Sequence, residues 1–230
     1  MEQNVWKTLH LAEFEKNAQA QFDLGVMYET GRGVRKDDAE AVRWYRQAAA
    51  QGYAAAQYNL GVMYENGRGV RQDDAEAVRW YQQAAEQGYA AAQNNLGAMY
   101  DEGRGVRQDD AEAVRWYRQA AEKGDVQAQN NLGVMCVNGR GVRQDDAEAA
   151  RWFRLAAVAV QGNATAQFNL GFMYAEGRGV RQDDAEVVRW FRQAAEQGNV
   201  RAQFNLGVMY ANGRGVRQDD AEAVRWYWQA

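Results

Sequence analysis

The sequence predicts an all-α fold: an α/α superhelical solenoid of about six helix-turn-helix repeats behind a single N-terminal helix. Three observations support this prediction. A Leu-Gly pair recurs with a step of 36 residues, and once of 38, at Leu24, Leu60, Leu96, Leu132, Leu170 and Leu206. A period of this length is typical of repeat arrays in which each unit buries its apolar face against its neighbours. Each period also holds two amphipathic segments with apolar residues at helical spacing.

The period sets the expected domain boundaries. Residues 1–16 form an N-terminal capping helix, in which Val5, Leu9 and Ala12 share one face. The repeats that follow span residues 17–52, 53–88, 89–124, 125–162, 163–198 and 199–230. The fourth repeat is two residues longer, and the sixth ends within its second helix.

The first helix of each repeat, helix A, is expected over about Ala54 to Asn66 in the second repeat. Gly61 lies in its interior, where glycine costs about 1 kcal/mol relative to alanine. We therefore expect another helix to approach closely at this glycine and its copies. The core face is marked by apolar residues at helical spacing, namely Ala56, Leu60, Met63 and Tyr64.

A short loop joins helix A to the second helix, helix B. Gly67 suits the left-handed position after a helix, and Val70 is expected to turn into the core. Asp73 and Asp74 then begin helix B, where carboxylates satisfy free N–H groups. Six copies of this acidic pair at helix starts indicate capping rather than metal binding. Gly-Arg-Gly in the loop resembles a phosphate cradle, but no strand precedes it and the aspartates would repel phosphate.

Charge and composition exclude several classes of function. A net charge of −4 and a pI near 5.2 give no global basic field for nucleic acid or an anionic membrane. No apolar run approaches the length of about 18 residues that inserts into a membrane. With Cys136 as the single cysteine and His10 as the single histidine, we expect no internal disulfide, metal site or cofactor. As written the chain is expected to be cytoplasmic, or periplasmic or secreted if a leader was removed.

The repeated pattern Ala-x3-Leu-Gly-x2-Tyr-x2-Gly-x-Gly-Val-x2-Asp-x3-Ala-x3-Tyr/Phe-x2-Ala-Ala resembles the Sel1-like repeat, a relative of the tetratricopeptide repeat. The resemblance covers residues 17–230. It implies a right-handed superhelix of antiparallel helix pairs, with helix A lining a concave surface that binds other proteins. Secreted cysteine-rich members of the family carry a disulfide in most units, and this chain has none.

Positions that differ between the repeats fall on one face of helix A and predict a partner site. Beside them runs a ladder of asparagines, whose amides can bind the backbone of an extended peptide; the alternative is that each one caps or bridges within the scaffold. The resemblance implies peptide contact, because tetratricopeptide repeats use an equivalent asparagine in this way. The candidate partner-binding residues are Tyr58, Asn59, Glu65, Asn94, Asn95, Asp101, Asn130, Asn131, Phe168, Asn169, Phe172, Phe204 and Asn205.

This face changes character along the chain. Acidic residues occupy one position of it in the first three repeats, and apolar residues replace them in the last three. A partner with a basic part and an apolar part would match both. The residues at this position are Glu29, Glu65, Asp101, Val137, Ala175 and Ala211.

The leading functional hypothesis is a non-enzymatic scaffold that binds a peptide or protein segment, since no catalytic constellation accompanies the single histidine and cysteine. The alternative is a self-assembling protein that forms homo-oligomers through its C-terminal helix, which ends in Trp226 to Ala230 without a polar cap. A weaker third possibility is a basic ridge for acidic partners, formed by Arg68, Arg71, Arg104 and Arg107.

The irregular step of 38 residues predicts a local change. Two residues would turn a helix by about 200°, so the chain must absorb them in the turn between the fourth and fifth repeats. We expect altered curvature there, and an apolar contact surface at Val158 and Val160.

Overall fold

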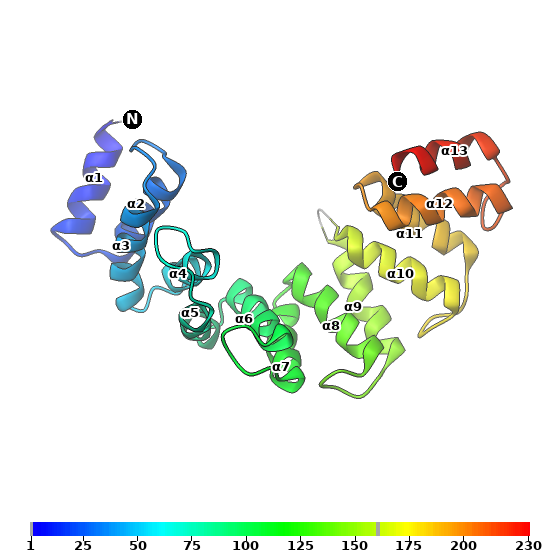
Figure 1. Ribbon diagram of the computed structural model, residues 1–230, viewed down its shortest axis with the longest axis horizontal. Coiled ribbons are helices and arrows are strands. Elements are labelled where there is room, and N and C mark those ends of the chain that lie inside the picture. Colours follow the sequence, from blue (N-terminus) through cyan, green and yellow to red (C-terminus); the bar gives the residue numbers. More distant parts are fainter. Residues whose placement is uncertain (1, 160–161) are drawn as a thin grey trace. The chain divides into compact units, whose positions relative to one another are not determined.

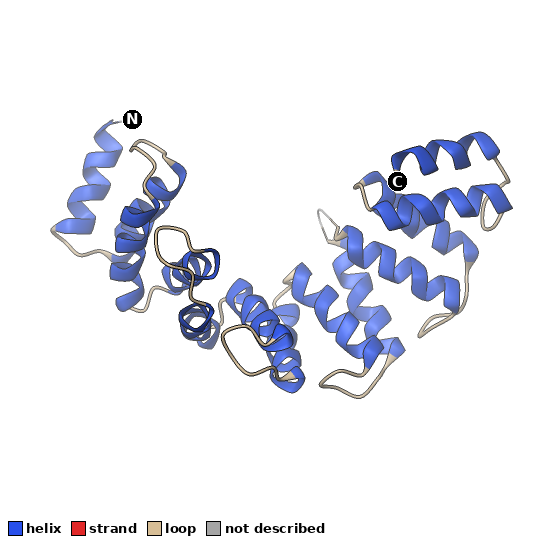
Figure 2. Ribbon diagram, viewed as in Figure 1, coloured by secondary structure: helices blue, strands red, loops and turns tan. Residues whose placement is uncertain are grey.

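The computed structural model describes residues 2–159 and 162–230. Over these residues the chain forms thirteen helices and no strand (Figures 1 and 2). They belong to two compact units, residues 1–120 and 121–230.

The first unit holds α1 (Glu2–Glu13) and then alternating A and B helices, each packed on the next along the chain. Ala12 of α1 is buried with Leu24 and Trp44, so α1 covers the start of this array. The alternating helices are α2 (Ala18–Thr30), α3 (Asp38–Ala50), α4 (Ala54–Asn66), α5 (Asp74–Glu86), α6 (Ala90–Glu102) and most of α7 (Asp110–Glu122).

The second unit repeats the same arrangement. Consecutive helices again pack on one another, and Phe168, Phe191 and Leu206 are buried in one shared cluster. The helices are α8 (Val126–Asn138), α9 (Asp146–Val158), α10 (Ala164–Glu176), α11 (Asp184–Glu196), α12 (Val200–Asn212) and α13 (Asp220–Gln229).

The interior glycine of helix A lies against the aromatic ring of helix B in the same repeat. A Cβ on Gly61 would lie 2.6 Å from the ring of Tyr81, and one on Gly133 would lie 2.6 Å from the ring of Phe153. The close approach predicted from the sequence is therefore confirmed. Any larger residue would push the two helices apart.

The predicted helix ends are also confirmed. Gly67 ends α4 with a φ of 64°, in the left-handed region that glycine tolerates. Asp73 caps α5, because its carboxylate accepts a hydrogen bond from the Glu76 amide at 3.0 Å.

The second glycine of the loop has a different role, which the sequence did not predict. A Cβ on Gly69 would lie 2.1 Å from the carbonyl oxygen of Asp38, at the start of helix B in the preceding repeat. The loop therefore rests directly on backbone of the repeat before it. Gly105, Gly179 and Gly215 make the same approach.

A buried glutamine in each helix A links consecutive repeats. The Gln57 amide donates to the carbonyl of Ala49, near the end of the preceding helix B, at 3.2 Å, and Gln87 donates to Gln57 at 2.6 Å. The first bond adds a donor to a carbonyl in the last turn of helix B, and the second satisfies the Gln57 side-chain oxygen. The buried glutamines are Gln21, Gln57, Gln93, Gln129, Gln167 and Gln203.

The two extra residues fall between α9 and α10 and lengthen neither helix, as expected. α9 ends at Val158 and α10 begins at Ala164, and both helices keep 13 residues. The backbone N–H of Asn163 donates to the Ala156 carbonyl at 3.0 Å. In a repeat of ordinary length, the backbone N–H of Tyr89 donates to the Ala84 carbonyl in the same way. Val158 is exposed, whereas Val160 lies outside the described residues. The altered curvature stays a prediction.

Candidate functional site

The partner-binding positions predicted from the sequence lie on helix A, and we call this set the A-helix stripe. Phe172 and Phe204 are its most exposed members, at 46 % and 55 %. Asn130 and Phe168 are buried. The remaining predicted residues are half-buried: Tyr58, Asn59, Glu65, Asn94, Asn95, Asp101, Asn131, Asn169 and Asn205.

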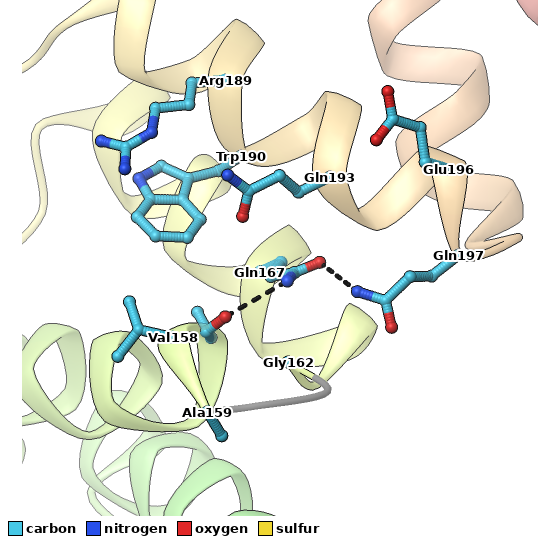
Figure 3. A pocket seen from close by; sticks show the side chains of 10 residues that line it. Val158, Ala159, Gly162, Gln167, Arg189, Trp190, Gln193, Glu196 and Gln197 are labelled. Carbon is cyan, nitrogen blue, oxygen red and sulfur yellow. Dashed lines mark hydrogen bonds between the residues drawn. The ribbon is translucent and has the colours of Figure 1, made fainter.

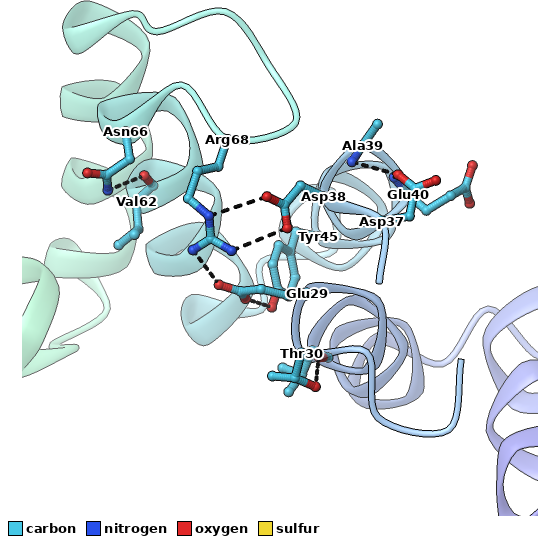
Figure 4. Close-up of polar contacts among 11 residues, drawn as sticks. Glu29, Thr30, Asp37, Asp38, Ala39, Glu40, Tyr45, Val62, Asn66 and Arg68 are labelled. Atoms are coloured by element: carbon cyan, nitrogen blue, oxygen red, sulfur yellow. Dashed lines mark hydrogen bonds and ion pairs between the residues drawn. The ribbon is translucent and has the colours of Figure 1, made fainter. Parts of the chain in front are cut away.

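In the first unit, the stripe carries a polar network that joins consecutive repeats (Figure 4). The Tyr45 hydroxyl of α3 donates to Glu29 of α2 at 2.5 Å. Arg68, from the loop of the next repeat, donates to the same carboxylate at 2.9 Å and to Asp38 at 3.3 Å. Asn59 of α4 completes the network through a hydrogen bond to the Tyr45 hydroxyl.

The network recurs one repeat later. Tyr81 donates to Glu65 at 2.5 Å, and Arg104 forms ion pairs with Glu65 at 3.0 Å and with Asp74 at 3.3 Å. Asn95 hydrogen-bonds the Tyr81 hydroxyl. The second aspartate of the Asp-Asp pair thus holds the arginine of the next repeat, in addition to its place in the first turn of helix B.

The electrostatics follow from burial. Burial raises the pKa of the Tyr45 and Tyr81 phenols, and their hydrogen bonds to glutamate raise it further. The hydrogen bond to Asp74 is the largest cause of the raised pKa of Arg104. Each network therefore holds a neutral phenol and a guanidinium that forms ion pairs with two carboxylates.

These contacts change the interpretation of the charged residues. Glu29 and Glu65 were expected to form an acidic strip for a basic partner, but both are engaged with a tyrosine and an arginine of the scaffold. Arg68 and Arg104 are engaged in the same networks, so the basic-ridge hypothesis loses two of its four arginines.

In the fourth and fifth repeats, which belong to the second unit, the same positions are apolar. Val137 stands at the position of Glu65, and Phe153 stands at the position of Tyr81. Arg178 keeps its ion pair with Asp146 at 2.7 Å. Because Phe153 replaces the tyrosine, Asn169 has no hydroxyl to bond, and its side-chain amide donates to the Asn130 side-chain oxygen at 3.2 Å instead.

An open cavity of about 180 Å³ lies at this place, between the fourth and fifth repeats. Phe153 and Met173 are its buried walls, and Phe172 is exposed beside them. Its complete lining is Val134, Val137, Asn138, Phe153, Asn169, Phe172, Met173 and Arg178.

Two further cavities of the second unit differ in chemistry. One of about 450 Å³ lies beside the inserted turn, between Val158 and Trp190, with polar walls that include Gln193 and Glu196 (Figure 3). Its Gln167 accepts a hydrogen bond from Gln197 at 2.8 Å. The other, of about 720 Å³, lies between α12 and α13 and is lined by Val200, Arg201, Phe204, Asn205, Tyr227 and Ala230.

Across the described part of the chain, His, Cys, Asp and Glu side chains form no group of three that could hold a metal ion. Within those same residues, no helix is both long enough and apolar enough to cross a membrane.

Comparison with known proteins identifies the repeat. The model of the Sel1 repeat matches residues 18–53, 54–89, 90–125, 126–157, 164–199 and 200–230. The chain belongs to the Sel1 repeat family. The resemblance found in the sequence and the all-α repeat fold are both confirmed. Sel1 repeats are in general modules for protein–protein interaction, and proteins built from them are typically non-enzymatic scaffolds.

Two solved Sel1 structures are similar over nearly the whole chain. A protective antigen of uropathogenic Escherichia coli with the SLR fold is 42% identical, with a TM-score of 0.92 over 98% of this chain. A Sel1 repeat protein from Oxalobacter formigenes is 35% identical, with a TM-score of 0.86 over 98% of this chain and 90% of its own.

Relatives also include longer proteins. The chain spans 48% of the E. coli structure. DAP3-binding cell death enhancer 1 from Mus musculus is 45% identical over 51 residues, which are 22% of this chain and 10% of the mouse protein.

The sequence did contain a signal for the networks. Where the stripe carries Glu29, Glu65 or Asp101, the following helix B carries tyrosine, at Tyr45, Tyr81 and Tyr117. Where it carries Val137 or Ala175, helix B carries Phe153 or Phe191. In these five repeats the acid and the hydroxyl change together, as expected for groups that satisfy each other, whereas the sixth repeat pairs Ala211 with Tyr227.

Proposed function

We propose that this Sel1 array is a protein-interaction module that binds an extended segment of another protein along the A-helix stripe. The observation that carries the proposal is the exposure of Phe172 and Phe204 among half-buried asparagines. Exposed aromatic rings beside amide groups are typical of surfaces that bind peptides, because rings supply apolar area and amides supply both donors and acceptors.

The test is a selection of random peptides displayed on phage against the full chain, followed by affinity measurements by fluorescence polarisation. The stripe variant Phe172→Ala/Phe204→Ala is expected to weaken binding at least about tenfold. The matched control is Leu155→Ala/Val158→Ala, which removes exposed apolar groups from α9 instead. Peptides that bind all three proteins equally, or no selected peptide at all, would contradict the proposal.

The asparagine ladder does not provide a clean test variant. Asn59 and Asn95 hydrogen-bond tyrosines that also contact Glu29 and Glu65. An aspartate in either place would bring a second carboxylate to the same hydroxyl, and the resulting repulsion would destabilise the scaffold. For this reason the proposed test changes exposed phenylalanines.

A second candidate function is self-association through α13. The favouring observation is a set of exposed apolar side chains on this helix: Val224, Tyr227 and Trp228. Compact apolar patches on a protein surface mark interaction sites.

A further inference from the structure

The lining of the cavity between the fourth and fifth repeats differs from the equivalent positions of the second and third repeats at three residues: Val137, Phe153 and Phe172 replace Glu65, Tyr81 and Ala98. In the first unit, the carboxylate of Glu65 fills the space between Tyr81 and Arg104, and bonds to both. In the second unit, Val137 is too short to reach Arg178, and Phe153 has no hydroxyl to offer. The cavity thus lies where the first unit has a carboxylate–phenol pair, and Phe172 adds a wall that the first unit lacks.

Its size limits what can occupy it. Sites for cofactors and drug-sized ligands enclose about 300–1,000 Å³, whereas a cavity of about 150 Å³ lined by aliphatic and aromatic residues binds benzene. At about 180 Å³, this cavity holds one group of that size. A single leucine or phenylalanine side chain is such a group.

The lining of the cavity also favours an apolar side chain as its occupant. Val134 and Val137 come from α8, Phe153 from α9, and Phe172 and Met173 from α10. None of these five side chains offers a hydrogen bond to a polar occupant, so a polar group buried here would lose its hydrogen bonds to water. Among the polar lining residues, Asn169 bonds to Asn130, Asn138 bonds to the Val134 carbonyl, and Arg178 bonds to Asp146 through Nε and Nη2.

Resting on the proposed function, we infer that this cavity anchors one large apolar side chain of the bound segment, and that the first unit has no equivalent anchor. The partner is thus a peptide that carries a leucine- or phenylalanine-sized residue at one required position. The equivalent positions of the first unit offer no such pocket to the bound segment, because the Glu65–Tyr81–Arg104 network occupies that space.

The chain itself supplies the variant that tests this inference. Val137→Glu/Phe153→Tyr rebuilds in the fourth repeat the pair found in the second, with Asn169, Arg178 and Asp146 already in place to complete the network. The variant is expected to fold, because the same chain uses the same combination of residues twice. Its carboxylate would fill the cavity.

The matched control for charge is Leu155→Glu. It adds a carboxylate at an exposed position of α9, outside the A-helix stripe, and leaves the lining of the cavity unchanged. Circular dichroism and urea unfolding show whether each variant is folded.

The probes are the peptides selected on phage against the wild-type chain. We expect one apolar residue in them whose replacement by alanine weakens binding about 10- to 100-fold, which is the effect of removing one buried leucine or phenylalanine side chain. We expect Val137→Glu/Phe153→Tyr to weaken binding of the original peptide at least as much and to bind the alanine-substituted peptide with little further loss. Leu155→Glu should leave both affinities unchanged.

Two outcomes would overturn the inference and are distinguishable from failure of the proposed function. Peptides that bind the stripe without a required apolar residue would leave the proposed function standing and remove the anchor. Peptides with such a residue that bind Val137→Glu/Phe153→Tyr and the wild-type chain equally would place the anchor elsewhere. Absence of any stripe-dependent peptide would instead remove the proposed function and the inference with it.

Discussion

The tyrosine–glutamate contact shows how single side chains set the character of this surface. Tyr81 is fully buried, and its hydroxyl finds its partner in the Glu65 carboxylate at 2.5 Å. A buried hydroxyl without a partner costs about 1–3 kcal/mol, and a buried charged group that loses its hydrogen bonds costs more. Each residue of the pair therefore makes the other necessary, and Phe153 with Val137 is the apolar solution to the same problem.

The pair predicts a coupling energy. Glu65→Val should lower the free energy of unfolding by about 1–3 kcal/mol, because it leaves the Tyr81 hydroxyl buried without an acceptor and removes one carboxylate from Arg104. Tyr81→Phe alone should cost less. The free energy of unfolding lost in the double variant should be smaller than the sum of the two single losses by at least about 1 kcal/mol.

Urea unfolding of the four proteins at neutral pH measures this coupling. Arg104 keeps its ion pair with Asp74 in all four, so the cycle isolates the contact between tyrosine and glutamate. Additivity within about 0.5 kcal/mol would show that the two side chains do not depend on each other.

At the scale of the elements, the loop after helix A docks each repeat onto the one before it. Gly69 lies on the Asp38 carbonyl, and Arg68 beside it contacts the carboxylates of Asp38 and Glu29. The glycine makes the close approach possible, and the arginine then reaches across the junction. The Gly-Arg-Gly motif is thus a connection between repeats.

A methyl group on Gly69 should break this connection. Gly69→Ala places alanine at a φ of 67°, which costs roughly 1–2 kcal/mol, and sets its Cβ 2.1 Å from a backbone oxygen that cannot rotate away. Gly52→Ala is the matched control, since Gly52 has a φ of 83° and no atom within 4 Å of the added Cβ.

Chemical unfolding of both variants should therefore give a larger loss for Gly69→Ala than for Gly52→Ala, by about 1–3 kcal/mol, the usual cost of overpacking. Equal losses would mean that the loop moves aside freely and that docking at Gly69 contributes nothing to stability.

The elements were predictable from the sequence because local rules determine them. The period predicted where each repeat lies. Asp73 and Gly67 marked helix ends and Gly61 marked a close approach, and the structure confirms these ends and this approach. The contacts between repeats were not predictable in the same way. From the sequence alone, Arg104 could pair with an aspartate of its own repeat or with one of the preceding repeat. Only the packing of the loop selects Asp74.

The candidate site was predictable only in part, for a related reason. Positions that differ between repeats located the stripe on helix A. The cavity depends on how far Val137 lies from its neighbours on the two adjacent helices. That distance can be obtained only from the structure. The sequence showed that valine replaces glutamate there, and the structure showed that a space results.

At the scale of the whole molecule, the outer face of α13 is the feature that differs from every comparable helix. Val188 and Phe191 of α11 are buried against α12, whereas Val224 and Tyr227 at the same positions of α13 are 51 % and 39 % exposed. Trp228 beside them is 86 % exposed and replaces Arg192. An apolar helix face of this kind is covered in the other repeats by a helix of the array.

The self-association candidate predicts that two copies cover this face for each other. An isologous dimer would bring Trp228 of each copy against Val224 and Tyr227 of the other, as a two-fold axis requires. The mass measured by light scattering should then rise with protein concentration. Val224→Gln/Trp228→Arg should give a monomer at every concentration, because it places polar groups at the centre of the contact.

The control applies the same kinds of change to exposed apolar residues elsewhere. Val158→Gln/Leu155→Arg alters the surface of α9 and leaves α13 intact, so this variant should associate as the wild-type chain does. A wild-type mass that stays monomeric at all concentrations would exclude self-association through α13. Loss of association in both variants would show that general surface polarity, rather than this helix face, controls it.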